Sequence, residues 1–263
     1  MLYLSRIVVV ILMVGTVAAS EGSLAMKDLI SVAIRNAELP KNLAKKIEAT
    51  AEENPAFITD MLTCLNGERY LRELVDKQHP LSQDYIPDDL IMLEEGDYML
   101  IRAEPLRRVA LESLNEMSAA AFADGIVLAV SSAYRSYDYQ VKVYNRNVRE
   151  LGKKIADLES AKPGFSQHQT GLVVDFYPVT DSFAKTKAGR WLTANASRFG
   201  WSISFPKGYE AATGYKWEGW HYRYVGLDLV RFIDNYFDGV QQYALRFLYE
   251  WELLKDSKIP FER

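Results

Sequence analysis

The chain has 263 residues, of which 49% are hydrophobic and 25% are charged, and this balance is typical of a globular protein. Its formal net charge is -4 and no basic block interrupts the mixture of charges, so a nucleic-acid partner is not expected. The single cysteine, Cys64, excludes an intrachain disulfide and a zinc site built from several cysteines, and we expect it to be a small buried residue.

The N-terminal residues have the composition of a secretory signal. Arg6 precedes an uncharged run, and this run of about 13 residues is shorter than the roughly 20 that a membrane-spanning helix needs. Small side chains precede a predicted cleavage near Ser20. We therefore expect residues 1–19 to be a signal peptide that contacts the membrane only transiently, and the protein to be exported to a periplasm or cell envelope. The alternative is an uncleaved segment that anchors the protein in the membrane.

The next part of the chain, residues 20–80, is predicted to be a helical extension, because its apolar residues recur at three-to-four spacing. Pro40 and Pro55 divide it into two or three short helices. A polar hinge that contains proline follows, and we put the main domain boundary there. His79 in this hinge is expected to be a solvated loop residue. The default role of the extension is a spacer.

The remainder alternates between helices and short strands. Periodic apolar stretches predict helices over residues 104–123, 137–151 and 228–254, the second of them capped by Ser136. Short apolar runs predict strands over residues 126–131, 171–176, 201–205 and 220–225. Because regular βαβ spacing is absent, we predict an α+β fold in which helices flank a small antiparallel sheet.

One motif with chemical potential spans residues 166–175, where a polar turn holds His168 and an apolar run leads to Asp175. An aspartate at the end of an apolar strand is costly to bury unless a positive group compensates it. Imidazole nitrogen and carboxylate oxygen are together suitable ligands for zinc. Taken alone, a structural histidine beside a capping or salt-bridged aspartate explains this motif at least as well.

A second motif lies in the aromatic-rich segment 215–225, which contains Glu218 and His221. In a regular strand these two side chains would point to opposite faces, because they are three positions apart. A break at Gly219 would let both approach one point, with His221 as a metal ligand and Glu218 as a general base that does not bind the metal. The alternative is a core strand whose polar residues are merely satisfied.

The third motif contains Arg135, in the loop between a predicted buried strand and a helix. A guanidinium there could bind a carboxylate bidentately or stabilise a developing oxyanion, although a salt bridge is the commoner role of a lone arginine. Together the three motifs supply two histidines, an aspartate, a glutamate and an arginine. That set matches a catalytic zinc site with three protein ligands and a base beside it.

At these residues the chain resembles the VanY-type D-alanyl-D-alanine carboxypeptidases, zinc peptidases of the group that also includes lysostaphin-like enzymes and the hedgehog domain. The resemblance covers roughly residues 82–235. Gly219 departs from the pattern, since proline is common at this position. The positions that match the family pattern are Tyr134, Arg135, Ser136, Gln140, Ser166, His168, Gly171, Asp175, Glu218 and His221.

The resemblance implies that one zinc ion per chain is bound by His168, Asp175 and His221, with Glu218 as the catalytic base. It also implies that Arg135 contacts the substrate and the tetrahedral intermediate. Gln140 and Ser166 would help to shape the substrate site. In these terms residues 81–240 form the catalytic domain and residues 241–263 a helical tail.

The activity that the resemblance implies is removal of the C-terminal D-alanine from peptidoglycan stem peptides. An LD-carboxypeptidase or a peptidoglycan endopeptidase of the same group is the nearest alternative. A zinc-containing binding module without turnover is the alternative from another class, and Glu218 and Arg135 argue against it because a structural zinc site needs neither. The sequence predicts no oligomeric state.

Overall fold

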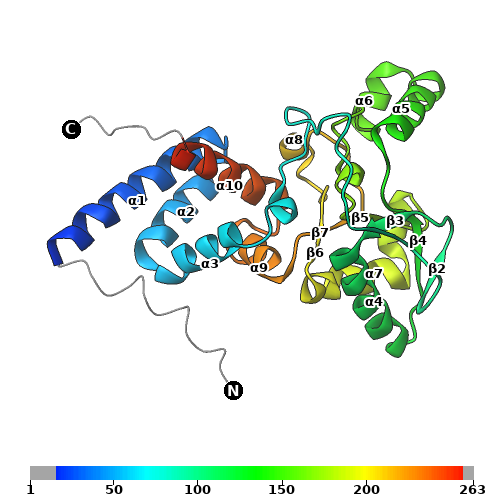
Figure 1. Cartoon of the computed structure of the whole chain (residues 1–263), viewed down its shortest axis with the longest axis horizontal. Helices are drawn as coiled ribbons and strands as arrows, with labels where there is room; N and C mark the ends of the chain where they lie inside the picture. The colour runs from blue at the N-terminus through cyan, green and yellow to red at the C-terminus, as the bar shows by residue number, and fades with distance from the viewer. Residues whose placement is uncertain (1–15, 257–263) are drawn as a thin grey trace.

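Helices from the two ends of the chain pack together at one end of the molecule (Figure 1). The computed structural model describes residues 16–256, so residues 1–15 of the predicted signal segment lie outside it. Pro55 is the first residue of the third helix, and the side chain of Asn54 caps this helix by accepting a hydrogen bond from Ala56 N at 3.0 Å. The helices at this end are α1 (Thr16–Asn36), α2 (Lys41–Glu53), α3 (Pro55–Asn66), α9 (Leu227–Tyr236) and α10 (Gln241–Asp256).

Aromatic side chains fill the space between these helices. The ring of Phe57 in α3 contacts Phe232 and Tyr236 in α9, with centroids 5.5 and 5.0 Å apart, and Phe247 in α10 at 6.1 Å. Helix α1 packs along α10. The described parts of residues 20–80 and 241–263 therefore share one hydrophobic core with α9.

The other end of the molecule is built around a five-stranded sheet with the order β2-β4-β5-β7-β6. All neighbours are antiparallel except β2 and β4, which are parallel. The predicted α+β fold with a small antiparallel sheet is confirmed, and the strands are shorter than expected. They are β2 (Tyr98–Leu100), β4 (Leu128–Ser132), β5 (Val173–Phe176), β6 (Trp201–Ile203) and β7 (His221–Tyr224).

Helix α4 (Arg108–Ala123) buries Leu114 and Met117 in a second core, which the sheet completes with Val130 and Trp201. The predicted cap of α5 (Tyr137–Leu151) by Ser136 is confirmed, since the Ser136 hydroxyl accepts a hydrogen bond from Tyr139 N at 3.2 Å.

The remaining helices are α6 (Lys153–Glu159), α7 (Lys187–Asn195) and α8 (Glu210–Thr213). A two-stranded sheet pairs β1 (Leu90–Met92) with β3 (Pro105–Arg107), and the 3-10 turns are η1 (Arg69–Arg72), η2 (Gln167–Thr170), η3 (Asp181–Lys185) and η4 (Ala196–Phe199).

Two buried charged residues join the helical end to the sheet. Arg223 in β7 is fully buried and donates from Nη2 to the carbonyls of Leu71 (3.2 Å) and Glu73 (2.8 Å), and burial lowers its pKa to about 10. Asp76 accepts hydrogen bonds from Gln242 Nε2 at 2.6 Å and from both backbone and ring nitrogens of His79. The connector after η1 is thus held on one side by β7 and on the other by α10.

Several expectations are changed by this packing. His79 is not a solvated loop residue, because its ring lies 2.7 Å from Asp76 Oδ1 and packs edge-on against Tyr249. The predicted helix over residues 228–254 is interrupted between α9 and α10, where Asp238 and Gly239 take positive φ angles of 54° and 73°.

Cys64 is buried as expected, and burial raises its pKa to about 12. Within residues 16–256, no helix combines the length and apolar character required to cross a bilayer.

Candidate active site

Two paired strands and a short turn bring the three predicted metal ligands together. Asp175 in β5 lies directly opposite His221, the first residue of β7, so the two side chains share a face of the sheet. His168 lies in η2, and Gly171 ends that turn with a φ of 69° that leads the chain into β5. This positive φ strains any other residue at position 171, and a Cβ atom there would also lie 2.9 Å from Leu90 Cδ2, which would have to move.

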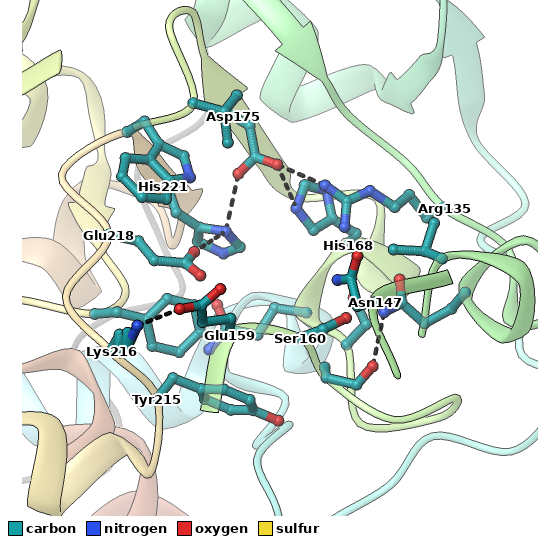
Figure 2. Close-up of a pocket in the computed structure, with 18 of the residues that line it drawn as sticks. Arg135, Asn147, Glu159, Ser160, His168, Asp175, Tyr215, Lys216, Glu218 and His221 are labelled. Atoms are coloured by element: carbon teal, nitrogen blue, oxygen red, sulfur yellow. Dashed lines mark hydrogen bonds and ion pairs between the residues drawn. The ribbon is translucent and has the colours of Figure 1, made fainter. Parts of the chain in front are cut away.

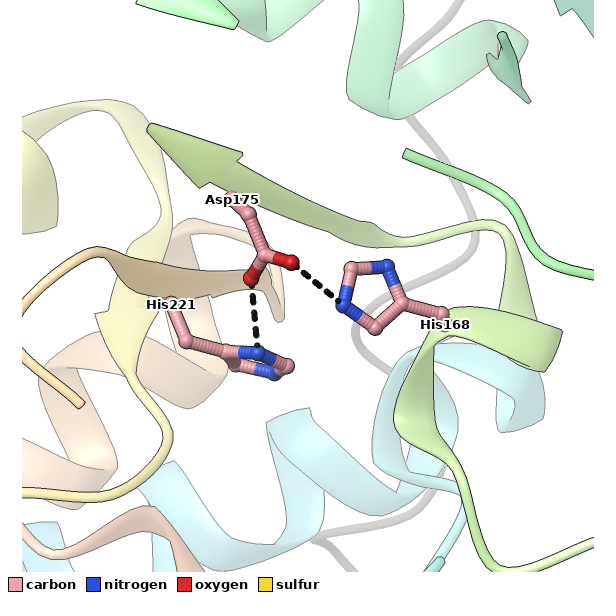
Figure 3. Close-up of side chains that lie close together, drawn as sticks. All are labelled: His168, Asp175 and His221. Carbon is pink, nitrogen blue, oxygen red and sulfur yellow. Dashed lines mark ion pairs between the residues drawn. The ribbon is translucent and has the colours of Figure 1, made fainter. Parts of the chain in front are cut away.

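The three side chains converge on one point (Figure 3). His168 Nε2 lies 3.1 Å from Asp175 Oδ2, and His221 Nδ1 lies 3.0 Å from Asp175 Oδ1. One ligand atom from each residue lies within 4.8 Å of the other two, and all three residues are buried. The geometry is that of a compact cluster with two imidazoles and one carboxylate.

The protonation states of His168, Asp175 and His221 suit the binding of a metal ion. His168 Nδ1 faces the carbonyl of Ala133 at 2.5 Å, which orients the ring and leaves Nε2 toward Asp175. Burial lowers the pKa of His221 to about 4, against the opposing effect of Asp175, so this imidazole is neutral at neutral pH. Burial alone would raise the pKa of Asp175, but His168, His221 and Arg135 outweigh it and hold that pKa well below its usual range. Neutral imidazole and ionised carboxylate are the forms that bind a metal.

Two atoms of the cluster are buried without a hydrogen bond, Asp175 Oδ1 and His221 Nε2. Asp175 Oδ1 lies 3.0 Å from His221 Nδ1, but this contact lacks the geometry of a hydrogen bond. Buried polar atoms without partners are costly, and a cation among these residues would remove part of that cost. Two imidazoles and one carboxylate are also a known donor set of catalytic zinc sites. The residues therefore fit a zinc ion.

Glu218 lies beside the cluster, with Oε2 3.4 Å from His221 Nδ1. The break expected at Gly219 is a turn between Glu218 and β7, and a Cβ atom at Gly219 would meet Trp217 at 3.1 Å. The Glu218 side chain is 16% exposed. Burial raises its pKa well above the usual range and the negative charge of Asp175 adds to the rise, whereas Arg135 opposes it. A carboxyl group with a raised pKa in a cleft is a candidate general base.

Arg135 lies on the opposite side of Asp175 from His221, and its Nη2 is 2.6 Å from Asp175 Oδ2 (Figure 2). Its Nε donates to Ser132 Oγ at 3.0 Å. Glu104 was not predicted from the sequence to belong to the site, yet its Oε2 accepts hydrogen bonds from Ser132 Oγ at 2.9 Å and from Ala133 N at 2.6 Å. Glu104 thus holds Ser132, which orients Arg135, and Ala133, which orients His168. No sequence motif around position 104, just before β3, indicated this contact.

All seven predicted site residues line one cavity of about 830 Å³. Figure 2 labels Arg135, His168, Asp175, Glu218 and His221 among the residues that line it. Gln140 is buried and donates from Nε2 to the carbonyl of Ala161 at 2.7 Å, so it secures the wall formed by α5 and the segment after α6. Ser166 is also buried, at the start of η2. Across the cavity, the ring of Phe205 packs between His221 and Tyr215, with centroid distances of 4.8 and 5.1 Å. The cavity is large enough for a short peptide.

Comparison with known proteins gives a consistent set of similarities. Residues 103–227 match the family model of VanY, D-alanyl-D-alanine carboxypeptidase. The chain is 34% identical to YodJ of Bacillus subtilis (strain 168) over 184 residues, which is 67% of either chain. The solved structure of the LdcB LD-carboxypeptidase superposes with a TM-score of 0.57 and 36% identity, over 64% of this chain and 85% of that one. A variant of the vancomycin resistance D,D-pentapeptidase VanY in complex with Zn(II) superposes with a TM-score of 0.54 and 29% identity, over 67% of this chain and 98% of that one.

Proposed function

Because the chain belongs to the VanY family of D-alanyl-D-alanine carboxypeptidases, we propose that it removes the C-terminal D-alanine from peptidoglycan stem peptides with one zinc ion as cofactor. The observation that carries this proposal is the buried cluster of His168, Asp175 and His221, which opens into the cavity that Glu218 and Arg135 also line. The Zn(II) complex of the related VanY supports the identity of the metal.

In this proposal His168 Nε2, the Asp175 carboxylate and His221 Nδ1 hold the metal. A zinc ion there would supply a Lewis acid and would lower the pKa of a bound water to about 7. Glu218 accepts a proton at its carboxylate from the attacking water and then delivers it to the nitrogen of the leaving D-alanine. Its raised pKa suits the first step, because a carboxylate with a higher pKa is a stronger base toward the attacking water.

Arg135 is proposed to bind the substrate on the other side of the scissile bond, where its guanidinium engages the terminal carboxylate and the oxyanion that develops during attack. Ser132 and Glu104 orient Arg135 for this task through the hydrogen bonds described above. Gln140 and Ser166 are proposed to shape the cavity wall against the peptide, and both are buried there.

A second candidate is LD-carboxypeptidase activity, because the LdcB LD-carboxypeptidase is similar to this chain at 36% identity. Incubation with purified muropeptides, read by mass spectrometry, separates the possibilities. Conversion of pentapeptides to tetrapeptides supports the proposal, conversion of tetrapeptides to tripeptides supports the second candidate, and opening of crosslinked dimers indicates an endopeptidase. No cleavage of any muropeptide by zinc-replete protein would contradict the enzymatic function and favour a binding module.

Export to a periplasm or cell envelope is proposed on the composition of residues 1–19. N-terminal sequencing of protein made in a bacterial host tests it. A chain that begins near Ser20 or Glu21 supports cleavage, and an intact chain in the membrane fraction supports an anchor. An intact chain that begins at Met1 in the cytoplasmic fraction would overturn export.

A further inference from the structure

A second cavity of about 300 Å³ adjoins the catalytic cavity and contains two lysines. The two cavities share Ser160, Phe165 and Tyr215 as a common wall. The second cavity, here called the lysine pocket, is lined in addition by Lys77, Asp157 and Lys162. Lys77 comes from the connector that Asp76 fixes to α10, so the helical end of the molecule contributes directly to this pocket.

The side chain of Lys77 is held in one position although it is on the surface. Its stem packs on Gly214, where a Cβ atom would lie 3.0 Å from Lys77 Cδ. Its Nζ donates to the carbonyl of Asp157 at 2.7 Å and lies 4.5 Å from the centroid of the Tyr215 ring. Ordering a lysine side chain costs rotamer entropy. Here the contacts of the ammonium group with a carbonyl oxygen and an aromatic ring offset that cost, and no carboxylate takes part.

The charge of the lysine pocket is not balanced within the pocket. The carboxylate of Asp157 is already engaged by Lys153 Nζ at 2.7 Å and by the Tyr144 hydroxyl at 2.5 Å. Across residues 16–256, neither Lys77 nor Lys162 forms an ion pair with a carboxylate. Burial lowers the pKa of Lys77, the negative charge of Asp157 opposes this effect, and the charge of Lys162 adds to the lowering. An anion in the pocket would relieve their repulsion.

The lysine pocket lies within reach of a peptide bound at the metal cluster. Tyr215 separates Lys77 from Phe205, and Phe205 in turn contacts His221, so two aromatic rings span the distance. The contacts along this path measure 4.5, 5.1 and 4.8 Å, and about four residues of extended peptide, at about 3.3–3.6 Å each, cover the whole path. The leaving D-alanine carries only its terminal carboxylate, which is assigned to Arg135. A further carboxylate of the peptide must therefore lie on the amino-terminal side of the scissile bond.

We propose that the lysine pocket, through Lys77 and Lys162, binds a carboxylate carried by the substrate peptide on the amino-terminal side of the scissile bond. This inference rests on the proposed peptidase function and adds a basis for substrate selection to it. The extension that precedes the catalytic domain is then more than a spacer, because the connector that ends it supplies one of the two lysines.

The test uses two synthetic peptides, Ala-γ-D-Glu-Lys-D-Ala-D-Ala with a free carboxylate on its acidic residue, and the same peptide with that carboxylate amidated. Zinc-replete wild-type protein is compared with the Lys77→Met/Lys162→Met double variant, each single variant, and a Lys45→Met control on the exposed face of α2. We expect the wild type to have a KM about tenfold lower for the acidic peptide than for the amide. In the double variant the KM for the acidic peptide rises to that for the amide, with kcat unchanged, and the control behaves as the wild type.

Failure of this inference can be told apart from failure of the proposed function. Cleavage of both peptides by the wild type with equal KM overturns the lysine pocket and leaves the peptidase function intact, and this comparison requires no variant to fold. An equal rise in KM for both peptides in the double variant also overturns it. If the wild type cleaves neither peptide, the peptidase function fails, and the affinities of the two peptides are then measured by calorimetry. Equal affinities overturn the anion site as well. A higher affinity for the acidic peptide that disappears in the double variant supports the anion site.

Discussion

Arg135 Nη2 lies 2.6 Å from Asp175 Oδ2, the same carboxylate oxygen that His168 Nε2 faces at 3.1 Å. A single buried carboxylate therefore connects the residue proposed to bind substrate with the residues proposed to bind metal. Burying an isolated carboxylate is costly, so each positive or hydrogen-bonding neighbour of Asp175 contributes to holding it ionised. Substitution of Arg135 or of either histidine is therefore expected to affect Asp175, so both zinc content and turnover should be measured for each variant.

Loss of a ligand should remove the metal. We expect the purified wild type to contain about one zinc per chain, and His168→Ala and His221→Ala to lose it, because two remaining ligands do not make a zinc site. His79→Ala is the matched control, since His79 contacts Asp76 rather than the cluster. Elemental analysis of the folded proteins is the measurement. Full zinc occupancy in both ligand variants would show that the cluster is not the metal site.

Glu218→Gln separates catalysis from metal binding. The change keeps the shape of the side chain and removes its basicity, so zinc content and fold should persist while kcat falls by about 10² to 10⁴-fold. Release of free D-alanine from a D-Ala-D-Ala-terminated peptide is measured alongside zinc content on the same sample. Glu150→Gln, an exposed position on α5, is the control. Near-normal release by zinc-replete Glu218→Gln protein would rule out Glu218 as the base.

Arg135→Gln should retain zinc and lower kcat by about 10² to 10³-fold, the effect typical of removing a group that stabilises an oxyanion. Arg149→Gln, at the exposed end of α5, should leave turnover unchanged. The alternative is that Arg135 only neutralises Asp175. In that case the variant loses zinc in parallel with activity, and excess zinc restores both.

The residues that gather at the candidate site could be predicted from the sequence because each motif is local. His168 and Asp175 lie within ten residues of each other, and Gly219 signals the turn that brings Glu218 beside His221. The register that puts Asp175 opposite His221 follows once the two short strands pair. Local spacing and residue chemistry therefore indicated the candidate residues, and the family resemblance supplied their expected roles as metal ligands and base.

Residues whose roles depend on distant partners could not be predicted in this way. Glu104 was expected to begin a helix, yet its carboxylate holds Ser132 and Ala133. His79 was expected to face solvent, and its contacts with Asp76 and Tyr249 exist only because α10 returns to the connector. An apolar helix face indicates that a partner exists without identifying it.

Asp76 should make the fold sensitive to acid. Burial alone would raise the pKa of Asp76, but hydrogen bonds from Gln78 N and His79, with the charge of Arg246, outweigh it and lower this pKa below 3.8. A carboxyl group with a lowered folded-state pKa adds stability that is complete above its unfolded pKa of about 3.9 and is lost as pH falls through the folded pKa. We therefore expect Asp76→Asn to reduce the free energy of unfolding by about 3 kcal/mol at pH 7, since it disrupts a buried network.

Urea unfolding at pH 7 and at acid pH measures this effect. The difference between wild type and Asp76→Asn should shrink as pH falls below about 4, because the wild-type carboxyl group is then increasingly protonated. Asp84→Asn, an exposed position in the hinge, should change the free energy of unfolding by less than about 0.5 kcal/mol. A difference that is the same at both pH values would show that the charge of Asp76 is not what stabilises the connector.

The last prediction concerns α10, which the sequence suggested was a helical tail. Phe247 in α10 is fully buried, with its ring 5.5 Å from that of Phe237 and 6.1 Å from that of Phe57, so it closes the core shared with the N-terminal helices. We expect Phe247→Ala to lower the free energy of unfolding by about 3–5 kcal/mol, because it leaves a cavity among aromatic rings. Leu253→Ala on the same helix is the matched control. Its side chain is 48% exposed, so the change should cost less than about 1 kcal/mol. Chemical denaturation of both variants distinguishes an integral helix from a dispensable one, and equally small effects would mean that α10 is not required for the fold.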